Sequence, residues 1–466
     1  MLFSSVVFLF TFLPLTILLY YVTPRKAKNA VLLVVSLIFY AWGEPVYIFL
    51  MILSILFNYF SGIDLARNEG RKEEQRKSLT ITVVVNLLIL GFFKYYGFLI
   101  ENINAALSVQ IPVRNLELPI GISFYTFQAL SYIIDVYRGK VNVLVNPIDF
   151  GAYVTMFPQL IAGPIVRYAD VEEQLRSRRE NIYKFGQGAR LFIVGLAKKV
   201  LLANTIGAVY TEAAAQAPAS VLTAWIGCAA YTFQIYYDFS GYSDMAIGLG
   251  KMFGFEFPQN FRYPYIARSV TDFWRRWHIS LGNWFREYVY IPLGGNRVSV
   301  LRHIMNLMIV WLLTGLWHGA SWNFVVWGLY YGVILIIEKY VTGRLLAKLP
   351  EVIGVLYCMF LVMIGWVLFA SPGLKEAFVY LGRMFGAGAS SIFDRHALYL
   401  IKSNWMLWIF LVVGCTPVMH RLGRVLLWDE EREASAPVAI LYLGMFFISV
   451  VYLVTETYNP FLYFRF

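Results

Sequence analysis

The 466-residue chain is 59% hydrophobic and only 14% charged, and apolar runs of about 20 residues recur along it. This composition excludes a soluble globular domain and predicts an all-α polytopic membrane protein. The net charge of +11 is dispersed over loops and helix ends. It therefore indicates orientation in the membrane and contact with lipids, and we expect no nucleic-acid partner.

About 11 to 12 membrane spans are expected. In chain order they cover residues 5–22, 30–43, 46–63, 79–100, 120–138, 187–209, 221–250, 303–317, 322–340, 351–370, 403–424 and 437–456. The apolar stretch 148–165 contains Pro158, Gly163 and Pro164, which predict a re-entrant element beside a cavity. We divide the chain into a transmembrane core, 1–436, and a terminal helix with an aromatic tail, 437–466.

Loop charges predict the orientation in the membrane. Nothing basic precedes the first span, whereas Arg25, Lys26 and Lys28 follow it, so it is not a cleaved signal and the N-terminus is expected outside. The basic loops 67–77 and 176–184 then face the cytoplasm. An even number of spans returns the C-terminus to the extracytoplasmic side.

Several chemistries find no support in the sequence. The three cysteines, Cys228, Cys358 and Cys415, have no paired spacing, so we expect neither a metal site nor a disulfide framework. No phosphate-binding loop is present, which argues against a pump driven by nucleotide hydrolysis. A transporter and a membrane-embedded enzyme both remain compatible with the span pattern.

The segment 255–302 is too polar to span lipid, yet it is rich in aromatic residues, a composition typical of the membrane interface. We expect it at the cytoplasmic face, partly inserted. Thr271 can cap a helix that runs to Tyr288 and carries Trp274 and His278 on one face. Arg275 and Arg276 then suit phosphates or lipid headgroups.

The stretch GLWHGASWN, 315–323, sets His318 among two tryptophans and two hydrogen-bonding side chains. Its small residues Gly315, Gly319 and Ala320 are expected to allow close backbone approach. One interpretation is a polar residue that holds membrane helices together. The setting favours the other interpretation, a neutral imidazole that acts as a general base. For His278, anchoring of the interfacial segment and catalysis stay equally open. The polar group around Asp238 is expected to pack against other polar side chains.

Motifs in a fixed order carry a resemblance to a known family. They are YAWGEP at 40–45, FFKYYGF at 92–98, LPIGISFYTFQALSYIIDVYRG at 118–139, FPQLIAGPIVRY at 157–168, YYDFSGYSDMAIGLGKMFGF at 236–255, WRRWHISLGNWFREYVYIPLGGNR at 274–297 and TGLWHGASWNF at 314–324. Together they resemble the membrane-bound O-acyltransferase (MBOAT) family, specifically its bacterial alginate O-acetylation branch. The likeness extends over about residues 5–370.

The resemblance implies a ring of helices around a tunnel, in the bacterial cytoplasmic membrane. It also implies transfer of a short acyl group, usually acetyl, from a cytoplasmic thioester to an extracytoplasmic polysaccharide. His318 then matches the catalytic histidine of the family and His278 its companion. The donor is acetyl-CoA or an acyl carrier protein thioester, used at Arg275 and Arg276, and no bound cofactor is expected. An extracytoplasmic SGNH-like acyltransferase is the implied partner. D-alanyl transfer to teichoic acid and a non-catalytic role in polysaccharide export are the alternatives.

The C-terminal stretch YNPFLYFRF, 458–466, has two interpretations. Its aromatic residues suit an interfacial anchor. It also resembles the aromatic C-terminal motif of a small peptide in D-alanylation systems, in which a tyrosine is thought to carry the acyl group. Tyr463 is the matching residue, and its phenol oxygen is a usable nucleophile once a base removes the proton.

Overall fold

The computed structural model describes residues 1–466 except 115, 162, 217–218, 419–435, 456–461 and 463–466. Every regular element of the described residues is helical, which confirms the all-α prediction. The chain divides into two compact units, Met1–Phe192 with Asp244–Pro258, and Ile193–Ser243 with Gln259–Phe466. Helices α9 (Ile182–Ala197) and α11 (Val221–Met252) each contribute residues to both units.

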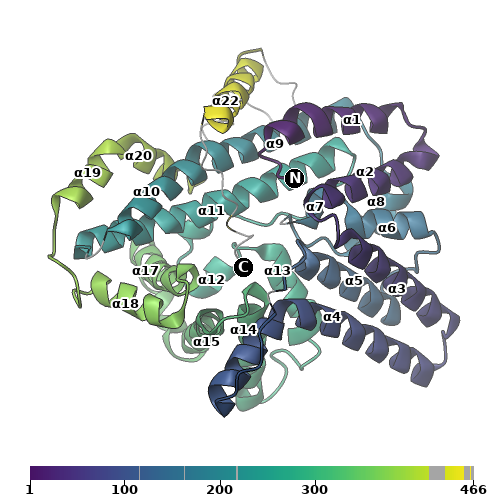
Figure 1. The fold of residues 1–466 in the computed structure, drawn as a ribbon, viewed down its shortest axis with the longest axis horizontal. Helices are drawn as coiled ribbons and strands as arrows, with labels where there is room; N and C mark the ends of the chain where they lie inside the picture. The colour runs from purple at the N-terminus through teal and green to yellow at the C-terminus, as the bar shows by residue number, and fades with distance from the viewer. Residues whose placement is uncertain (115, 162, 217–218, 419–435, 456–461, 463–466) are drawn as a thin grey trace. The chain divides into compact units, whose positions relative to one another are not determined.

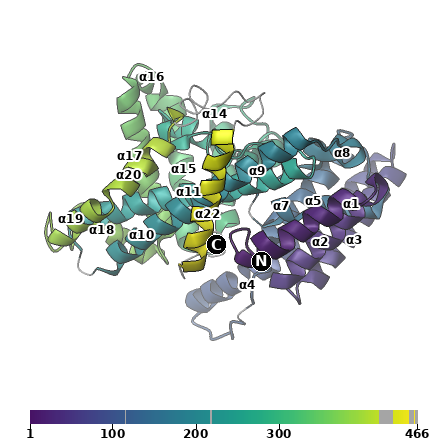
Figure 2. The same ribbon diagram turned by 90° about the horizontal axis from the view of Figure 1, so that it is seen from above.

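The first unit is built mainly from the N-terminal helices. They are η1 (Phe8–Phe12), α1 (Leu13–Val22), η2 (Arg25–Ala27), α2 (Lys28–Gly43), α3 (Ile48–Arg67), α4 (Lys72–Leu107), α5 (Ile122–Tyr137), α6 (Pro147–Thr155), α7 (Phe157–Leu160) and α8 (Tyr168–Ser177). Helices α1, α2 and α3 lie side by side, and α5 packs against α3 and α4 (Figures 1 and 2). Most residues of α5 are buried, so this helix lies in the core of the unit.

The second unit holds the polar segment and the C-terminal helices. Its elements are η3 (Lys198–Asn204), α10 (Thr205–Ala215), η4 (Pro264–Ile266), α12 (Val270–Trp274), α13 (Ile279–Phe285), η5 (Arg286–Tyr290), α14 (Val300–His318), α15 (Trp322–Ile337), η6 (Glu338–Thr342), α16 (Gly343–Leu346), α17 (Glu351–Ala370), α18 (Leu374–Met384), α19 (Arg395–Ser403), α20 (Trp405–Gly414) and α22 (Ala436–Thr455). Helix α14 packs against α15, α15 against α17, and α17 against α18 (Figure 1).

Eight helices of the described residues are long and apolar enough to cross a membrane. They cover Arg25–Gly43, Ile48–Arg67, Lys72–Leu107, Ile182–Ala215, Val300–His318, Trp322–Leu346, Glu351–Ala370 and Ala436–Thr455. Each corresponds to one of the expected spans. The chain is therefore a multi-pass membrane protein.

The other expected spans are helical but differ from a straight apolar rod. Residues 5–22 form the shorter apolar helix Phe8–Val22, and 120–138 form the buried α5. Of the span expected at 403–424, the described part contains α20, which meets the preceding α19 at 65°, and residues 419–424 lie outside the described residues. The stretch 148–165 contains α6 and α7, which are interrupted at Met156, as a helix broken near Pro158 should be.

Candidate active site

The polar segment does not form the continuous helix predicted from Thr271 to Tyr288. Ser269 is the N-cap of α12, because its Oγ accepts a hydrogen bond from the Asp272 amide at 3.0 Å. Helix α12 has only five residues, and α13 begins after His278, whose φ of 47° is left-handed. The prediction was therefore wrong about both the cap and the helix. Trp277 and His278 are also buried, so much of the segment's aromatic surface packs into the second unit.

Asn260 explains why the helix breaks at this point. Its backbone carbonyl accepts a hydrogen bond from the Ile279 amide at 3.0 Å, and two residues later the Arg262 amide donates to the Arg276 carbonyl at 2.9 Å. These backbone bonds hold an extended stretch against the turn between α12 and α13. Hydrogen bonding within one helix gives way here to bonds with a segment 18 residues earlier.

The side chain of Asn260 is a hydrogen-bond acceptor for the same turn. Its Oδ1 lies 3.1 Å from His278 Nδ1, 2.9 Å from Ser280 Oγ and 3.2 Å from the Ser280 amide nitrogen. Asn260 itself is completely buried. One carboxamide oxygen thus holds both the histidine ring and the first turn of α13.

The other ring nitrogen of His278 has no hydrogen-bond partner among the described residues. Nε2 is buried, and the ring is enclosed by Phe239, Phe261 and Trp317, with centroid distances of 4.7, 6.5 and 6.0 Å. Burial lowers the pKa of His278 to about 3, so its imidazole is neutral. A neutral imidazole with one nitrogen engaged and the other free can accept or donate a proton there.

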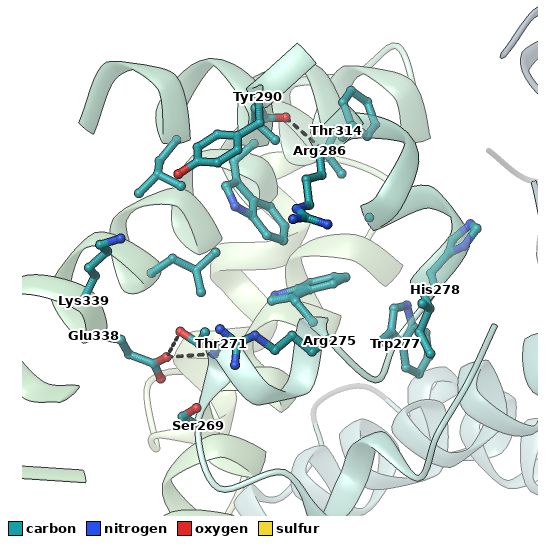
Figure 3. Close-up of a pocket in the computed structure, with 18 of the residues that line it drawn as sticks. Ser269, Thr271, Arg275, Trp277, His278, Arg286, Tyr290, Thr314, Glu338 and Lys339 are labelled. Atoms are coloured by element: carbon teal, nitrogen blue, oxygen red, sulfur yellow. Dashed lines mark hydrogen bonds between the residues drawn. The ribbon is translucent and has the colours of Figure 1, made fainter. Parts of the chain in front are cut away.

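His278 lines a cavity of about 880 Å³ in the second unit. Figure 3 shows His278 and Trp277 on one side of this cavity and Lys339 and Glu338 on the opposite side. Trp274 and Trp311 also line it, and their rings meet edge to face at 4.8 Å. The cavity is therefore lined by aromatic rings and by charged groups, with Glu338 and Lys339 opposite His278 and with Arg275 and Arg286 between the two sides (Figure 3).

The two predicted donor-binding arginines have different surroundings. Arg275 is exposed, lines the cavity and makes no ion pair or hydrogen bond with the described residues (Figure 3). Arg276 instead donates from Nε to Asp272 Oδ1 at 2.9 Å, and it does not line the cavity. Of these two arginines, only Arg275 is thus available to an anion in the cavity.

Positive charge dominates the cavity wall. Its cationic residues are Arg268, Arg275, Arg286 and Lys339. The one acidic residue of the described lining, Glu338, is engaged in capping α12. It accepts the amides of Val270 and Thr271, each at 2.7 Å, and the Thr271 hydroxyl at 2.6 Å. A phosphate or another acidic ligand suits this wall.

His318 is the last residue of α14 and is not among the residues that line the cavity. Its ring contacts those of Trp317, Trp327 and Phe369, with centroids 4.9 to 5.1 Å away. Trp317 also contacts His278, so one indole separates the two histidines. Asn323, an expected partner, donates its amide to the Leu368 and Ser371 carbonyls at 3.2 and 3.0 Å.

The glycines of GLWHGASWN have the role that the sequence suggested. A Cβ added at Gly315 would overlap the carbonyl oxygen of Phe324, and one at Gly319 would overlap the Phe324 ring. On the facing helix, a Cβ at Gly328 would overlap the carbonyl oxygen of Trp311. Small residues therefore let the backbones of α14 and α15 approach closely beside His318. This part of the prediction is confirmed.

The sequence did not single out two polar residues of this region, Asn260 and His303. Asn260 lies in the segment PQNF, and no spacing rule connects it with His278. His303 lines the cavity, with Nε2 2.8 Å from the Tyr290 hydroxyl and Nδ1 2.6 Å from the Tyr340 hydroxyl. The polarity of both side chains within aromatic surroundings was the available signal.

Asp238 forms a buried ion pair with Lys199, with 2.7 Å between Oδ1 and Nζ. Its Oδ2 accepts a hydrogen bond from the Leu462 amide at 2.9 Å, and Leu462 is buried. The prediction that Asp238 packs against polar groups is confirmed. Tyr463, the proposed acyl carrier, lies outside the described residues.

Comparison with known proteins gives consistent matches along the chain. The family described as MBOAT, membrane-bound O-acyltransferase, matches residues 140–350. A protein of Azotobacter vinelandii named probable alginate O-acetylase AlgI is 38% identical over 499 aligned residues, covering all of both chains. The peptidoglycan O-acetyltransferase of Helicobacter pylori is 35% identical over 84% of this chain and 81% of its own length. The teichoic acid D-alanyltransferase of Streptococcus thermophilus is 29% identical over 47% of this chain and 56% of its own.

Proposed function

Because the chain belongs to the membrane-bound O-acyltransferase family, in its alginate O-acetylation branch, and is an O-acetyltransferase, we propose the route that its acyl group takes. The enzyme accepts a short acyl group, acetyl, from a cytoplasmic thioester. It moves this group across the membrane for O-acylation of an extracytoplasmic polysaccharide. The observation that carries this proposal is His278, a neutral histidine that lines an aromatic cavity and whose buried Nε2 has no hydrogen-bond partner among the described residues.

The chemistry needs a base beside the hydroxyl that attacks the carbonyl carbon. A hydroxyl oxygen attacks the thioester carbonyl as its proton moves to Nε2 of His278, and the new C–O bond forms while the C–S bond breaks. The proton then passes to the departing thiolate, so the base is regenerated and no other reagent is consumed. The aromatic walls limit the access of water, which would otherwise hydrolyse the thioester.

His318 stays a proposed catalytic residue. The sequence favoured it as the base, whereas its ring-packed surroundings favour orientation of the reacting groups from the other side of Trp317. We therefore assign proton removal to His278 and orientation to His318. In this scheme the reaction needs both histidines, and of the two interpretations that the sequence left open for His278 we adopt catalysis.

The donor is proposed to enter at the cationic side of the cavity. Both acetyl-CoA and an acyl carrier protein thioester carry a phosphopantetheine phosphate, and Arg275 has a guanidinium with no competing carboxylate. Arg276, which is paired with Asp272, contributes less to donor binding. No bound cofactor is part of the proposal.

The proposed location is the bacterial cytoplasmic membrane, with both termini extracytoplasmic. Support comes from the basic residues that follow the first span and from the basic loops 67–77 and 176–184. An SGNH-like acyltransferase on the outer side is the proposed partner that delivers the acyl group to the polymer.

Tyr463 is proposed as the first acceptor of the acyl group. The preceding residue, Leu462, is buried, and its amide donates a hydrogen bond to Asp238 in the second unit. Tyr463→Phe retains the aromatic ring and removes the hydroxyl. It is expected to abolish polymer acylation at normal protein levels, whereas full acylation in this variant would leave only the anchor interpretation.

The function is tested by ester analysis of the surface polysaccharide. Mass spectrometry should detect O-acetyl groups in wild-type cells and none after deletion of the gene. D-alanyl esters lost from teichoic acid would support the first alternative. If polymer reaches the surface in reduced amount but with normal ester content, the protein is an export component instead.

A further inference from the structure

The amide of Asn260 has a fixed orientation. The backbone amide of Ser280 can only donate a hydrogen bond, and it lies 3.2 Å from the atom assigned as Oδ1. If the carboxamide were rotated by half a turn, an NH₂ group would face this N–H, and two donors would oppose each other. The oxygen of Asn260 must therefore face the turn that contains His278.

This orientation determines which nitrogen of His278 carries the proton. Because an oxygen without a proton lies 3.1 Å from Nδ1, the hydrogen bond exists only if Nδ1 is the donor. A neutral imidazole has one N–H, so Nε2 then carries the lone pair. Nε2 is also the nitrogen with no partner among the described residues.

Asn260 fixes the backbone of His278 as well as its ring. A left-handed conformation is uncommon for a residue other than glycine, and it persists only where surrounding contacts hold it. Here the backbone carbonyl of Asn260 accepts the amide of Ile279, the next residue after His278. The side-chain oxygen and the backbone carbonyl of Asn260 therefore both determine the orientation of the imidazole.

We propose that Asn260 is a positioning residue for acyl transfer, which holds His278 as its Nδ1–H tautomer so that Nε2 takes the proton from the acceptor hydroxyl. This inference rests on the proposed function, in which His278 is the base. The groups around the imidazole are the neutral Asn260 and the rings of Phe239, Phe261 and Trp317, none of which ionises. His318 is the nearest titratable neighbour that these contacts reach, on the other side of Trp317.

The tautomer can be tested on the wild-type protein without any assay of activity. The full-length chain, labelled with ¹⁵N-histidine and reconstituted in lipid bilayers at pH 7, has only five histidines to assign. Solid-state NMR resolves the ¹⁵N signals of the imidazole rings, and the signals that are missing from the spectrum of His278→Gln belong to His278. We expect a protonated Nδ1 and an unprotonated Nε2. An unprotonated Nδ1 would overturn the proposal, whatever the enzyme's substrate is.

Substitutions of Asn260 test the consequence for the reaction. Asn260→Leu should lower the ester content of the polymer by about 10²-fold or more, as expected when a catalytic imidazole loses its orienting partner. Ser280→Ala is the matched control, because it removes one bond to the same oxygen and leaves the bond to His278. It should retain nearly full acylation.

Asn260→Asp supplies a readout that a purely structural role would not change. Its carboxylate still accepts the Nδ1 hydrogen bond, but its charge stabilises the protonated imidazole and raises the pKa of His278. Transfer of labelled acetyl from acetyl-CoA in isolated membranes should therefore fall about tenfold between pH 8 and pH 5.5 in this variant, with little change in the wild type. The same profile in both proteins would contradict the positioning role.

The outcomes separate this inference from the function it rests on. If His278→Gln keeps normal acylation, His278 is not the base, and the proposed function is wrong at that point. If His278→Gln abolishes acylation while Asn260→Leu does not, the function stands and the role of Asn260 is refuted.

Discussion

His278 and His318 are both buried in the second unit, at 2% and 8% exposure, but their surroundings differ in kind. His278 interrupts two short helices, borders a cavity and is held by hydrogen bonds from a distant asparagine. His318 ends a long helix and is packed by aromatic rings where two helices approach closely. The site of His278 combines fixed hydrogen bonds with an adjacent cavity. The site of His318 is closely packed and does not border that cavity. Of these two histidines, only the one outside the GLWHGASWN motif lines the cavity.

The largest expected effect is the loss of polymer acylation when either histidine is replaced by alanine. His278→Ala and His318→Ala should each reduce polymer acylation about 10³-fold or more in well-expressed, folded protein, because general base catalysis alone contributes up to about 10⁴-fold. Free imidazole should restore part of the activity of His278→Ala only, because His278 lines the cavity and His318 does not. Transfer assays in membranes, with and without imidazole, measure this difference. Rescue of His318→Ala instead would reverse the roles assigned to the two residues.

Glycine substitutions test packing in the two regions. Gly315→Ala should destabilise the protein by about 1–3 kcal/mol, because its methyl group forces α14 and α15 apart. Gly282→Ala is the control near His278, since a Cβ there meets no atom within 4 Å and α13 favours alanine. It should be neutral or stabilising by up to about 1 kcal/mol. Thermal unfolding in detergent measures both, and equal losses would mean that the two regions are packed alike.

Arginine substitutions test the cationic side of the cavity. Charge reversal at both Arg275 and Arg276 should weaken donor use without displacing the segment, and Arg275→Ala alone should raise the KM for the donor about three- to tenfold. Arg276→Ala should change KM less than twofold, because its guanidinium is already paired with Asp272. Initial rates at several donor concentrations give the comparison. An unchanged KM in Arg275→Ala would place the donor elsewhere.

The smallest expected effect is the dependence of folding stability on pH that results from His278. Because burial lowers the pKa of His278 to about 3, its imidazole stays neutral and activity should not fall from its protonation between pH 8 and pH 5.5. An unfolded chain binds this proton near pH 6.5, so folding stability declines as pH falls from 6.5 toward 3. The contribution at pH 5.5 is about 1 kcal/mol. His278→Gln should remove this part of the pH dependence in unfolding measurements, and an unaltered slope would contradict it.

Much of the fold was predictable because membrane spans follow from hydrophobic length alone. Eight expected spans correspond to long apolar helices, and the glycines around His318 were correctly assigned to close packing. Local propensity did not predict the break at His278, since the bonds that cause it come from Asn260, 18 residues earlier. The different environments of Arg275 and Arg276 also depend on a cavity formed by residues far apart in the sequence, which neighbouring residues alone do not predict.

The buried contact among Lys199, Asp238 and Leu462 has a consequence for the order of synthesis. Leu462 follows Asp238 by 224 residues, so at about 5–20 residues per second its amide emerges about 11–45 seconds later. During that interval the ion pair with Lys199 must stabilise the Asp238 carboxylate without the hydrogen bond from Leu462. The nascent protein therefore completes this contact only when translation has passed the final membrane span. If the ribosome stalls earlier, Asp238 Oδ2 lacks the hydrogen bond that the Leu462 amide donates.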